Sequence, residues 1–265
     1  MKRKTPVVLT VAGSDNSCGA GLQADLKTIT ALGGYAQTAV TCVVAEVPGK
    51  VSAIQAVTPA IVAEQIRTSL EAFPVAAAKT GMLFSAPIIR AVAETLTGRR
   101  IPLVVDPVMV ASSGDPLLKK NALTAYRERL FPLATLITPN LDELRILSGK
   151  PCRNVEEMTA AGEELVREFG CAFLVKGGHL HTREAVDVLI TPTGTHTFTA
   201  PFRPRADTHG TGGTFSAAIA SALAHRHPLP EAVRQAKAYI TAAIDQRLTW
   251  GQTSALEHRL DTRKI

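Results

Sequence analysis

The residues that most clearly indicate ligand-binding chemistry form one short glycine-rich loop near the end of the chain. The segment Asp207–Thr214 reads DTHGTGGT and runs directly into an apolar-periodic stretch. Because Phe215, Ile219 and Leu223 recur at helical spacing, we predict a helix that begins where the glycines end. A helix N-terminus presents unpaired N–H groups and a partial positive charge, and glycine lets a ligand approach the backbone closely. A tight turn before a helix explains the glycines equally well, but Asp207 and the three threonine hydroxyls favour a phosphate-binding site.

Polar clusters follow five of the short apolar runs in the chain. These clusters are Gly13–Asp15, Lys79–Met82, Asp106–Met109, Thr138–Asn140 and Lys176–His179. In a parallel sheet all carboxyl strand ends share one edge, and ligands bind there. We therefore expect the five clusters and the glycine loop to converge on one rim. That arrangement is typical of an enzyme with two adjacent ligands.

The elements that would position these clusters alternate along the chain between short apolar runs and longer helical patterns. Strands are expected at 7–12, 35–45, 51–57, 75–78, 103–105, 136–137 and 172–175, and helices at 20–32, 59–73, 88–96, 141–147, 155–169, 212–224 and 230–248. Segments 185–190 and 195–200, separated by TPTG, predict a β-hairpin. The alternation predicts a single α/β domain over residues 1–265, with a mainly parallel sheet and helices on both of its faces.

Composition excludes several classes of protein. Of the 265 residues, 46% are hydrophobic and 20% are charged, and every apolar run is interrupted well short of the roughly 18 residues of a membrane span. The net charge is +6, but five of the 29 basic residues lie at the two tips of the chain, which leaves 24 against 23 acidic residues. A nearly neutral body argues against nucleic acid as a partner. Because the four cysteines form no CxxC pair, we expect free thiols in a cytoplasmic protein.

Several of these segments resemble one known family. The matching stretches are residues 12–28 (AGSDNSCGAGLQADLKT), 104–118 (VVDPVMVASSGDPLL), 138–143 (TPNLDE), 175–179 (VKGGH) and 207–220 (DTHGTGGTFSAAIA). They are similar to the hydroxymethylpyrimidine/phosphomethylpyrimidine kinase family of thiamine biosynthesis, in the ribokinase-like superfamily. The resemblance implies a three-layer α/β/α fold with a small edge flap at residues 35–57, and a homodimer.

The activity that the resemblance implies is phosphorylation of 4-amino-5-hydroxymethyl-2-methylpyrimidine, and then of its monophosphate, with ATP and Mg²⁺. Some relatives also accept pyridoxine or pyridoxal. The chain has no Walker A sequence, so the phosphate cradle must come from the glycine loop and its helix dipole. Phosphoryl transfer mainly requires positioning and neutralisation of charge, which glycine N–H groups, a lysine and Mg²⁺ supply.

The resemblance also implies the residues of each subsite. The catalytic set is Gly210, Thr211, Gly212, Gly213 and Lys176, and the nucleotide set is Asn140, Lys176, Thr208, Gly210 and Gly212. Asp106 and Glu143 are the residues expected to be associated with Mg²⁺. The pyrimidine set is Gly13, Asp25, Val44, Glu46, Met82 and Val108, with Asp25 accepting a hydrogen bond from the exocyclic amine and Met82 and Val108 as apolar walls. Several members also have plain structural explanations: Asn140 and Glu143 have the spacing of a helix capping box, and Lys176 could be a solvated side chain at a strand end.

Four positions depart from the family pattern. Gly213 stands where relatives carry cysteine or aspartate, and glycine cannot take a proton. The protein is therefore expected to be either a slow kinase or a catalytically weakened homologue that binds the pyrimidine. His209 or Asp207 could replace the missing group. Glu46 stands where the family has glutamine, which puts the identity of the substrate in question and keeps a pyridoxine/pyridoxal kinase open as an alternative. Cys18 and Ser112 replace glycine and lysine.

Overall fold

The computed structural model describes residues 5–109, 120–178, 180, 184–203 and 209–261. The strands are β1 (Val7–Asp15), β2 (Tyr35–Val47), β3 (Lys50–Ala56), β4 (Val75–Thr80), β5 (Leu103–Val105), β6 (Leu136–Ile137), β7 (Ala172–Lys176), β8 (Glu184–Thr191), β9 (Gly194–Pro201), β10 (Leu248–Trp250) and β11 (Thr253–Ala255). The α-helices are α1 (Gly21–Ala31), α2 (Pro59–Ala72), α3 (Ala86–Leu96), α4 (Lys120–Ala125), α5 (Leu141–Ser148), α6 (Val155–Phe169), α7 (Thr211–Ala224) and α8 (Leu229–Asp245). A π-helical turn at Tyr126–Leu130 and a 3-10 turn at Phe131–Leu133 follow α4.

One sheet of nine strands, in the order β3-β2-β1-β4-β5-β6-β7-β8-β9, runs through the described part of the chain. The pairs from β2 to β7 are parallel, and β3, β8 and β9 add antiparallel edges. Helices connect the parallel strands, and they cover both faces of the sheet. The central strands are therefore apolar on both sides; in β1 every residue except Ser14 is buried.

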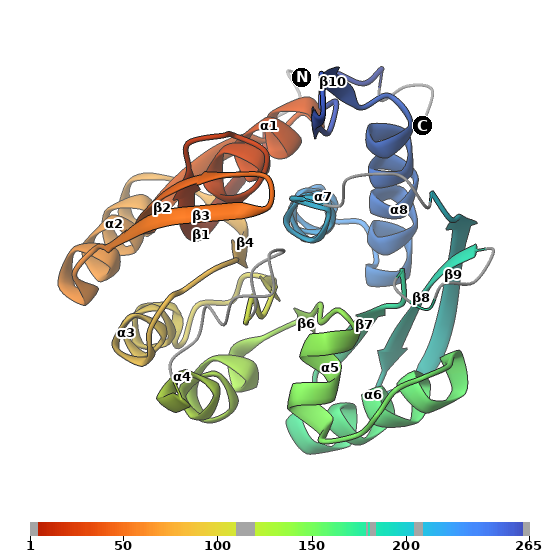
Figure 1. Ribbon diagram of the computed structural model, residues 1–265. Helices are drawn as coiled ribbons and strands as arrows, with labels where there is room; N and C mark the ends of the chain where they lie inside the picture. The colour runs from red at the N-terminus through yellow and green to blue at the C-terminus, as the bar shows by residue number, and fades with distance from the viewer. Residues whose placement is uncertain (1–4, 110–119, 179, 181–183, 204–208, 262–265) are drawn as a thin grey trace.

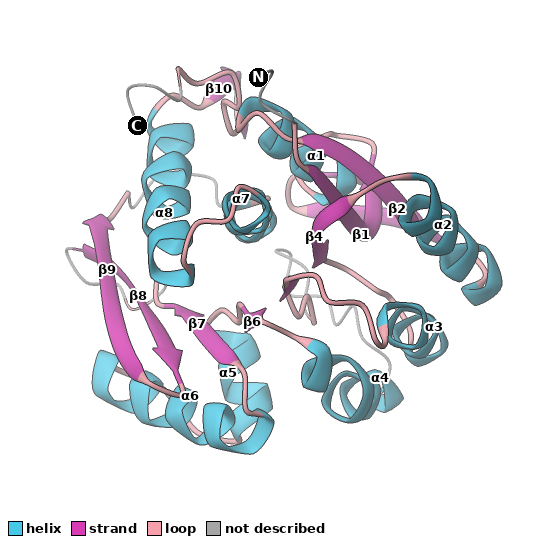
Figure 2. Ribbon diagram, turned by 180° about the vertical axis from the view of Figure 1, so that it is seen from behind, coloured by secondary structure: helices cyan, strands magenta, loops and turns pink. Residues whose placement is uncertain are grey.

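The helices form two layers with the sheet between them (Figures 1 and 2). Helices α1, α7 and α8 pack on one face, where Ile29, Ile219 and Tyr239 belong to one buried apolar cluster. Helices α2 to α6 pack on the other face around a second cluster that includes Ile66 and Phe131. This is the three-layer α/β/α arrangement expected from the sequence, with the β2–β3 pair as an edge flap.

Most element boundaries agree with the sequence expectations, and the hairpin at 185–200 is confirmed as β8–β9. The expectation for the last helix was wrong at its end, because α8 stops at Asp245 and Leu248 instead begins the small antiparallel pair β10–β11. Helix α4 and the β10–β11 pair were not expected. No helix in the described residues is both long and apolar enough to cross a bilayer.

Candidate active site

Two glycines at the start of α7 differ in whether their backbone position requires glycine. Gly210 is the N-cap, with φ of 77°, and a Cβ there would overlap the carbonyl oxygen of Gly19. Only glycine fits that position without moving the backbone. At Gly213 a Cβ would lie 3.7 Å from Asp25 Oδ1 and 3.8 Å from Lys79 Nζ, which are ordinary contact distances. The absence of a side chain at Gly213 is therefore not imposed by packing.

Lys176, at the end of β7, reaches the same helix start. Its Nζ lies 3.0 Å from Asp106 Oδ1, and a Cβ on Gly212 would lie 3.1 Å from it. The side chain is only 13% exposed, so the solvated alternative considered from the sequence is wrong. Burial opposes its charge, but Asp106 and Glu143 raise the pKa of Lys176, which keeps the ammonium protonated. A fixed cation thus stands beside the N-terminus of α7.

Asp106 follows β5 and is almost fully buried. Besides Lys176, Thr138 donates to its Oδ1 at 3.2 Å and Ser216 donates to its Oδ2 at 3.3 Å. Burial raises the pKa of a carboxyl group, but the ammonium groups of Lys176 and Lys79 outweigh it and hold the pKa of Asp106 below its ordinary value. Asp106 is therefore an ionised carboxylate with both oxygens directed by neighbours.

Asn140 and Glu143 form the expected capping box of α5. The Asn140 side chain accepts from Glu143 N at 2.9 Å, and Glu143 Oε2 accepts from Asn140 N at 2.8 Å. Burial raises the pKa of Glu143 to about 7, with Lys176 opposing that shift and Asp106 adding to it. Glu143 is thus within electrostatic reach of the Lys176–Asp106 pair, and a parallel bridge joins Asn140 to Lys176. The capping function and a place in the site coexist.

Asp25 lies inside α1 and is completely buried. Lys79 Nζ donates to its two oxygens at 2.9 and 2.8 Å, and Thr10 Oγ1 donates to Oδ2 at 2.5 Å. Burial raises the pKa of Asp25, and the Lys79 and Thr10 contacts oppose that rise. The sequence-based expectation did not include Lys79 or Thr10, which occupy much of the hydrogen-bonding capacity of this carboxylate.

The remaining predicted substrate residues lie at irregularities of the sheet. The β1–β2 register shifts between Ala12 and Ser14, at Gly13, and the β2–β3 register shifts between Ala45 and Glu46. Such bulges redirect side chains and occur often beside active sites. A Cβ on Gly13 would lie 3.0 Å from Cys42 Sγ and 3.8 Å from Met82 Sδ, so Gly13 and Met82 are neighbours, as expected. Val44 is buried on β2, and Val108 is partly exposed after β5.

A group of polar residues joins the flap to the first glycine turn. Asn16 Oδ1 accepts from Glu46 N at 2.7 Å, and Asp15 Oδ2 lies 3.4 Å from His209 Nε2. Burial and the Asp15 carboxylate raise the pKa of Glu46, while His209 opposes the shift. Hydrogen bonds from His209, Ser17 and Ala20 outweigh burial and lower the pKa of Asp15 to about 2. His209 is thereby committed to Asp15, which weakens the idea that it replaces a base at Gly213.

A third buried ion pair lies beyond Lys176, where no site residue was expected. Lys237 Nζ on α8 contacts Asp187 Oδ2 at 2.6 Å and Ala185 O at 3.0 Å, and Gly177 N donates to Asp187 Oδ1 at 3.1 Å. The pair holds the turn that follows β7. No sequence pattern predicted this pair, because Lys237 looks like an ordinary helix residue.

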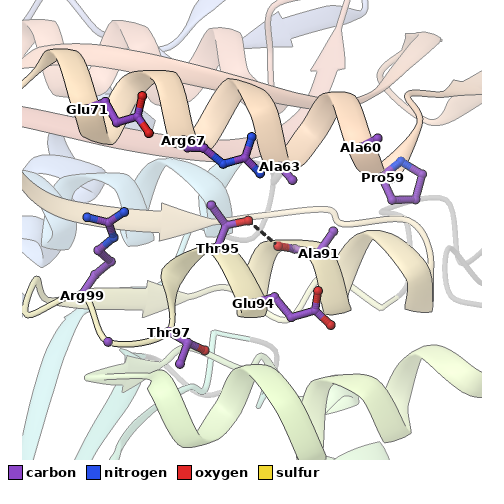
Figure 3. Close-up of a pocket in the computed structure, with 11 residues that line it drawn as sticks. Pro59, Ala60, Ala63, Arg67, Glu71, Ala91, Glu94, Thr95, Thr97 and Arg99 are labelled. Carbon is purple, nitrogen blue, oxygen red and sulfur yellow. Dashed lines mark hydrogen bonds between the residues drawn. The ribbon is translucent and has the colours of Figure 1, made fainter.

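Two features fall outside this arrangement. Thr208, expected to bind the nucleotide, and Asp207 and Ser112 lie outside the described residues. A groove of about 720 Å³ lies between α2 and α3, where Ala60, Ala63 and Arg67 line it from α2 and Ala91 and Glu94 from α3 (Figure 3). It contains none of the predicted site residues. The described residues include no cluster of three or more histidine, cysteine, aspartate or glutamate side chains that could hold a metal ion by themselves.

Comparison with solved structures places this fold among small-molecule kinases. The pyridoxal kinase of Bacillus subtilis in an ADP complex superposes with a TM-score of 0.89 at 35% identity, covering 96% of this chain and 98% of that one. The phosphomethylpyrimidine kinase of Clostridium difficile superposes with a TM-score of 0.80 at 38% identity, covering 91% and 100%. The chain has the ribokinase-like fold of nucleotide-dependent vitamin kinases.

Sequence comparison narrows the class. The profile of the phosphomethylpyrimidine kinase family matches residues 15–257. The hydroxymethylpyrimidine/phosphomethylpyrimidine kinase of Streptomyces coelicolor is 44% identical, over 90% of this chain and 88% of that protein. The thiamine biosynthesis bifunctional protein ThiED of Geobacter sulfurreducens is 48% identical over 89% of this chain, which spans about half (49%) of that longer protein. The chain belongs to the phosphomethylpyrimidine kinase family, so the predicted family and phosphotransferase class are confirmed.

Proposed function

We propose that the protein transfers the γ-phosphoryl group of ATP to 4-amino-5-hydroxymethyl-2-methylpyrimidine and to its monophosphate. The observation that carries this proposal is the meeting of Lys176, Asp106 and the first turn of α7 at one point, with the buried Asp25 adjoining the same turn. We infer that phosphate binds on the Lys176 side of this point and that the pyrimidine binds on the Asp25 side.

The nucleotide phosphates would lie against the N–H groups that follow Gly210, with Lys176 neutralising negative charge. Asn140, which follows β6, pairs with Lys176 through a parallel backbone bridge. Thr208 completes the nucleotide-binding set that the family resemblance implies. Gly212 leaves room for Lys176 to approach the helix start, because a side chain there would crowd the ammonium. Helix N-termini bind phosphate without further charged groups, and the lysine adds a point charge.

Mg²⁺ would be associated with Asp106 and Glu143. Both provide carboxylate oxygens, which suit this ion, but Asp106 already accepts from Lys176 and Glu143 from the Asn140 backbone. Mg²⁺ commonly keeps several waters and uses one or two carboxylates together with substrate phosphates, so these two residues fit an ion held through water. When bound, the ion would neutralise charge on the transferring phosphoryl group.

The aminopyrimidine would lie between Met82 and Val108, with Asp25 at its exocyclic amine and Glu46 on the flap. The Met82 carbonyl is fixed by a 2.7 Å hydrogen bond from Thr41 Oγ1, which holds this wall of the site in place. Burial raises the pKa of the Glu46 carboxyl, which stands on the flap where the family pattern has glutamine.

In the reaction, the substrate hydroxyl would attack the γ-phosphorus in line with the leaving ADP. The N–H groups of Gly212 and Gly213 and the Lys176 ammonium would stabilise charge on the transferred group. The flap, held by Asn16, would limit access of water to the acceptor. Asp106 would keep Lys176 oriented toward α7.

A pyridoxal or pyridoxine kinase is a second candidate, because solved structures of pyridoxal kinases superpose closely on this chain. We also propose that residues 1–265 form one catalytic domain, since the nine-stranded sheet and the helices that pack on it carry the described site residues. We further propose a cytoplasmic homodimer that pairs through the flap, where Val43 and Val47 are 53% and 52% exposed. Light scattering tests the dimer.

The deciding experiment incubates the purified protein with ATP, Mg²⁺ and, separately, the hydroxymethylpyrimidine, its monophosphate and pyridoxine. Products are identified by mass. A phosphorylated pyrimidine is expected, whereas product from pyridoxine alone selects the second candidate. No product from folded protein with any acceptor selects the catalytically silent pyrimidine-binding homologue.

A further inference from the structure

His209 lies where the glycine loop before α7 meets the glycine turn between β1 and α1. It directly precedes Gly210, the N-cap of α7, and its side chain is only 11% exposed. A Cβ on Gly19 would lie 2.9 Å from His209 Cδ2, and a Cβ on Gly210 would overlap the carbonyl oxygen of Gly19. The imidazole therefore packs on the β1–α1 turn, at a point where only glycine leaves room for the two backbones to approach each other.

Asp15, the last residue of β1, contacts His209 and also organises the β1–α1 turn. Its carboxylate accepts from Ser17 N at 2.7 Å, Ser17 Oγ at 2.9 Å and Ala20 N at 2.8 Å. Its Oδ2 lies 3.4 Å from His209 Nε2, and only 2% of its side chain is exposed. Since several donors fix this buried carboxylate in one position, it can orient the imidazole that contacts it.

The β1–α1 turn also holds the flap. Asn16, next to Asp15, accepts a hydrogen bond from Glu46 N at 2.7 Å. Burial and the nearby Asp15 carboxylate raise the pKa of Glu46, and His209 opposes that rise. His209 thus offsets the repulsion between an acidic group on the flap and an acidic group on the turn that holds the flap.

These contacts connect the two sides of the proposed active site. The glycine loop leads into the first turn of α7, where Gly212 adjoins Lys176 on the nucleotide side. Gly13, just before the β1–α1 turn, and Glu46 on the flap belong to the predicted acceptor set. A shift of either side relative to the other would change the distance between the γ-phosphorus and the acceptor oxygen, and a misplacement of about 1 Å can lower a rate by about 10²-fold.

We propose that His209 is a positioning residue that holds the glycine loop on the β1–α1 turn through Asp15, and that it thereby couples nucleotide binding to acceptor binding. The inference rests on the proposed function and names the residue that sets the relative position of its two ligands. A nucleotide that orders the glycine loop fixes His209, and His209 fixes the turn from which Asn16 holds the flap. Each ligand should therefore tighten binding of the other by the same factor, because such coupling is reciprocal.

The first test measures the coupling by calorimetry, without turnover. The Kd of the hydroxymethylpyrimidine is measured alone and with saturating ADP and Mg²⁺. We expect ADP to lower this Kd about fivefold or more in the wild-type protein, and His209→Leu to bring the ratio of the two Kd values close to one. A ratio close to one in the wild type, or an unchanged ratio in folded His209→Leu, overturns the inference and leaves the proposed function standing. Absence of pyrimidine binding under both conditions overturns the proposed function, and this inference with it.

The second test compares His209→Gln with His209→Leu in steady-state assays of folded protein. Glutamine offers an amide N–H in place of the ring Nε2, whereas leucine fills the space without a donor. We expect His209→Leu to lower kcat about tenfold or more while KM for ATP changes by less than about threefold, and His209→Gln to recover most of the lost kcat. Equal losses in the two variants, or no loss in either, overturn the inference.

Two further variants complete the experiment. His258→Leu is the matched control, because it also removes a buried histidine, one that contacts Thr28 and Tyr239. It should leave kcat and the Kd ratio unchanged, and a loss as large as that of His209→Leu overturns the inference. Asp15→Asn should lower the Kd ratio as His209→Leu does and add little to it in the double variant, whereas additive effects overturn the inference. If His209→Leu does not fold, Asp15→Asn and His209→Gln provide the same comparison.

Discussion

Alanine at the two ends of the glycine loop should have opposite effects on stability. At Gly210, alanine would adopt φ of 77° and overlap the Gly19 carbonyl oxygen. The left-handed conformation costs about 1–2 kcal/mol, and relief of the overlap by backbone movement costs about 1–3 kcal/mol more. At Gly213 the backbone is helical and the added methyl group makes ordinary contacts, so alanine gains up to about 1 kcal/mol from the unfolded state.

The two variants should therefore differ in unfolding free energy by about 2–6 kcal/mol, with Gly210→Ala the less stable. Urea unfolding monitored by circular dichroism measures this difference, provided that both variants keep the wild-type m-value. Calorimetric titration with ADP reports whether displacement of the loop also weakens phosphate binding in Gly210→Ala. A difference below about 1 kcal/mol would refute the assignment of distinct backbone requirements to the two glycines.

Three further predictions address the flap, the substrate pocket and the C-terminal segment. Asn16→Ala removes the hydrogen bond between the Asn16 side chain and Glu46 N, which holds the flap. Steady-state kinetics should show KM for the acceptor raised about fivefold, which corresponds to a hydrogen bond of about 1 kcal/mol. An unchanged KM contradicts this role. Glu46→Gln should tighten binding of the aminopyrimidine, measured as Kd by calorimetry, whereas weaker binding shows that the acid is matched to its ligand. His258 packs against Thr28 and Tyr239, and burial, aided by Lys27, lowers its pKa to about 4. Because the unfolded state takes up the proton first, the unfolding free energy falls as the pH drops below about 6.5, by about 2 kcal/mol at pH 5. His258→Gln should lose that pH dependence in urea titrations at pH 7 and pH 5. The same change of unfolding free energy with pH in both proteins argues against this role of His258.

Sequence patterns predicted the elements of this fold well where apolar periodicity was strong. The buried run at Val7 and the helical pattern before Leu223 each specify one element, because their side chains must be removed from water whatever surrounds them. The end of α8 was harder, since Leu248 continues the apolar pattern of the helix while pairing with Ala255 in a strand. Pairing across a short turn outweighed local periodicity there.

The site could be predicted where its residues belong to ordered motifs, and not where it depends on contacts between distant elements. Asp106 and Lys176 follow strands whose carboxyl ends meet, so topology alone brings them near each other. Lys79 lies near the end of β4, in a polar cluster that is visible in the sequence, but nothing local indicates that its side chain pairs with Asp25, 54 positions away. A buried lysine is recognisable only when its partner is known.

The three buried lysine–aspartate pairs in the described part of the chain also bear on how the stability of this protein could be increased. Replacing a buried pair with well-packed apolar side chains is often neutral or stabilising, by about 1–4 kcal/mol. Lys79–Asp25, Lys176–Asp106 and Lys237–Asp187 are therefore places where a search for heat-resistant variants would find gains. The first two pairs belong to the proposed active site, so we expect their replacement to lower turnover. Selection for thermal stability alone would favour replacement of pairs in the proposed active site. Selection for both stability and activity would instead retain those pairs and favour substitutions in the helical layers and at Lys237–Asp187.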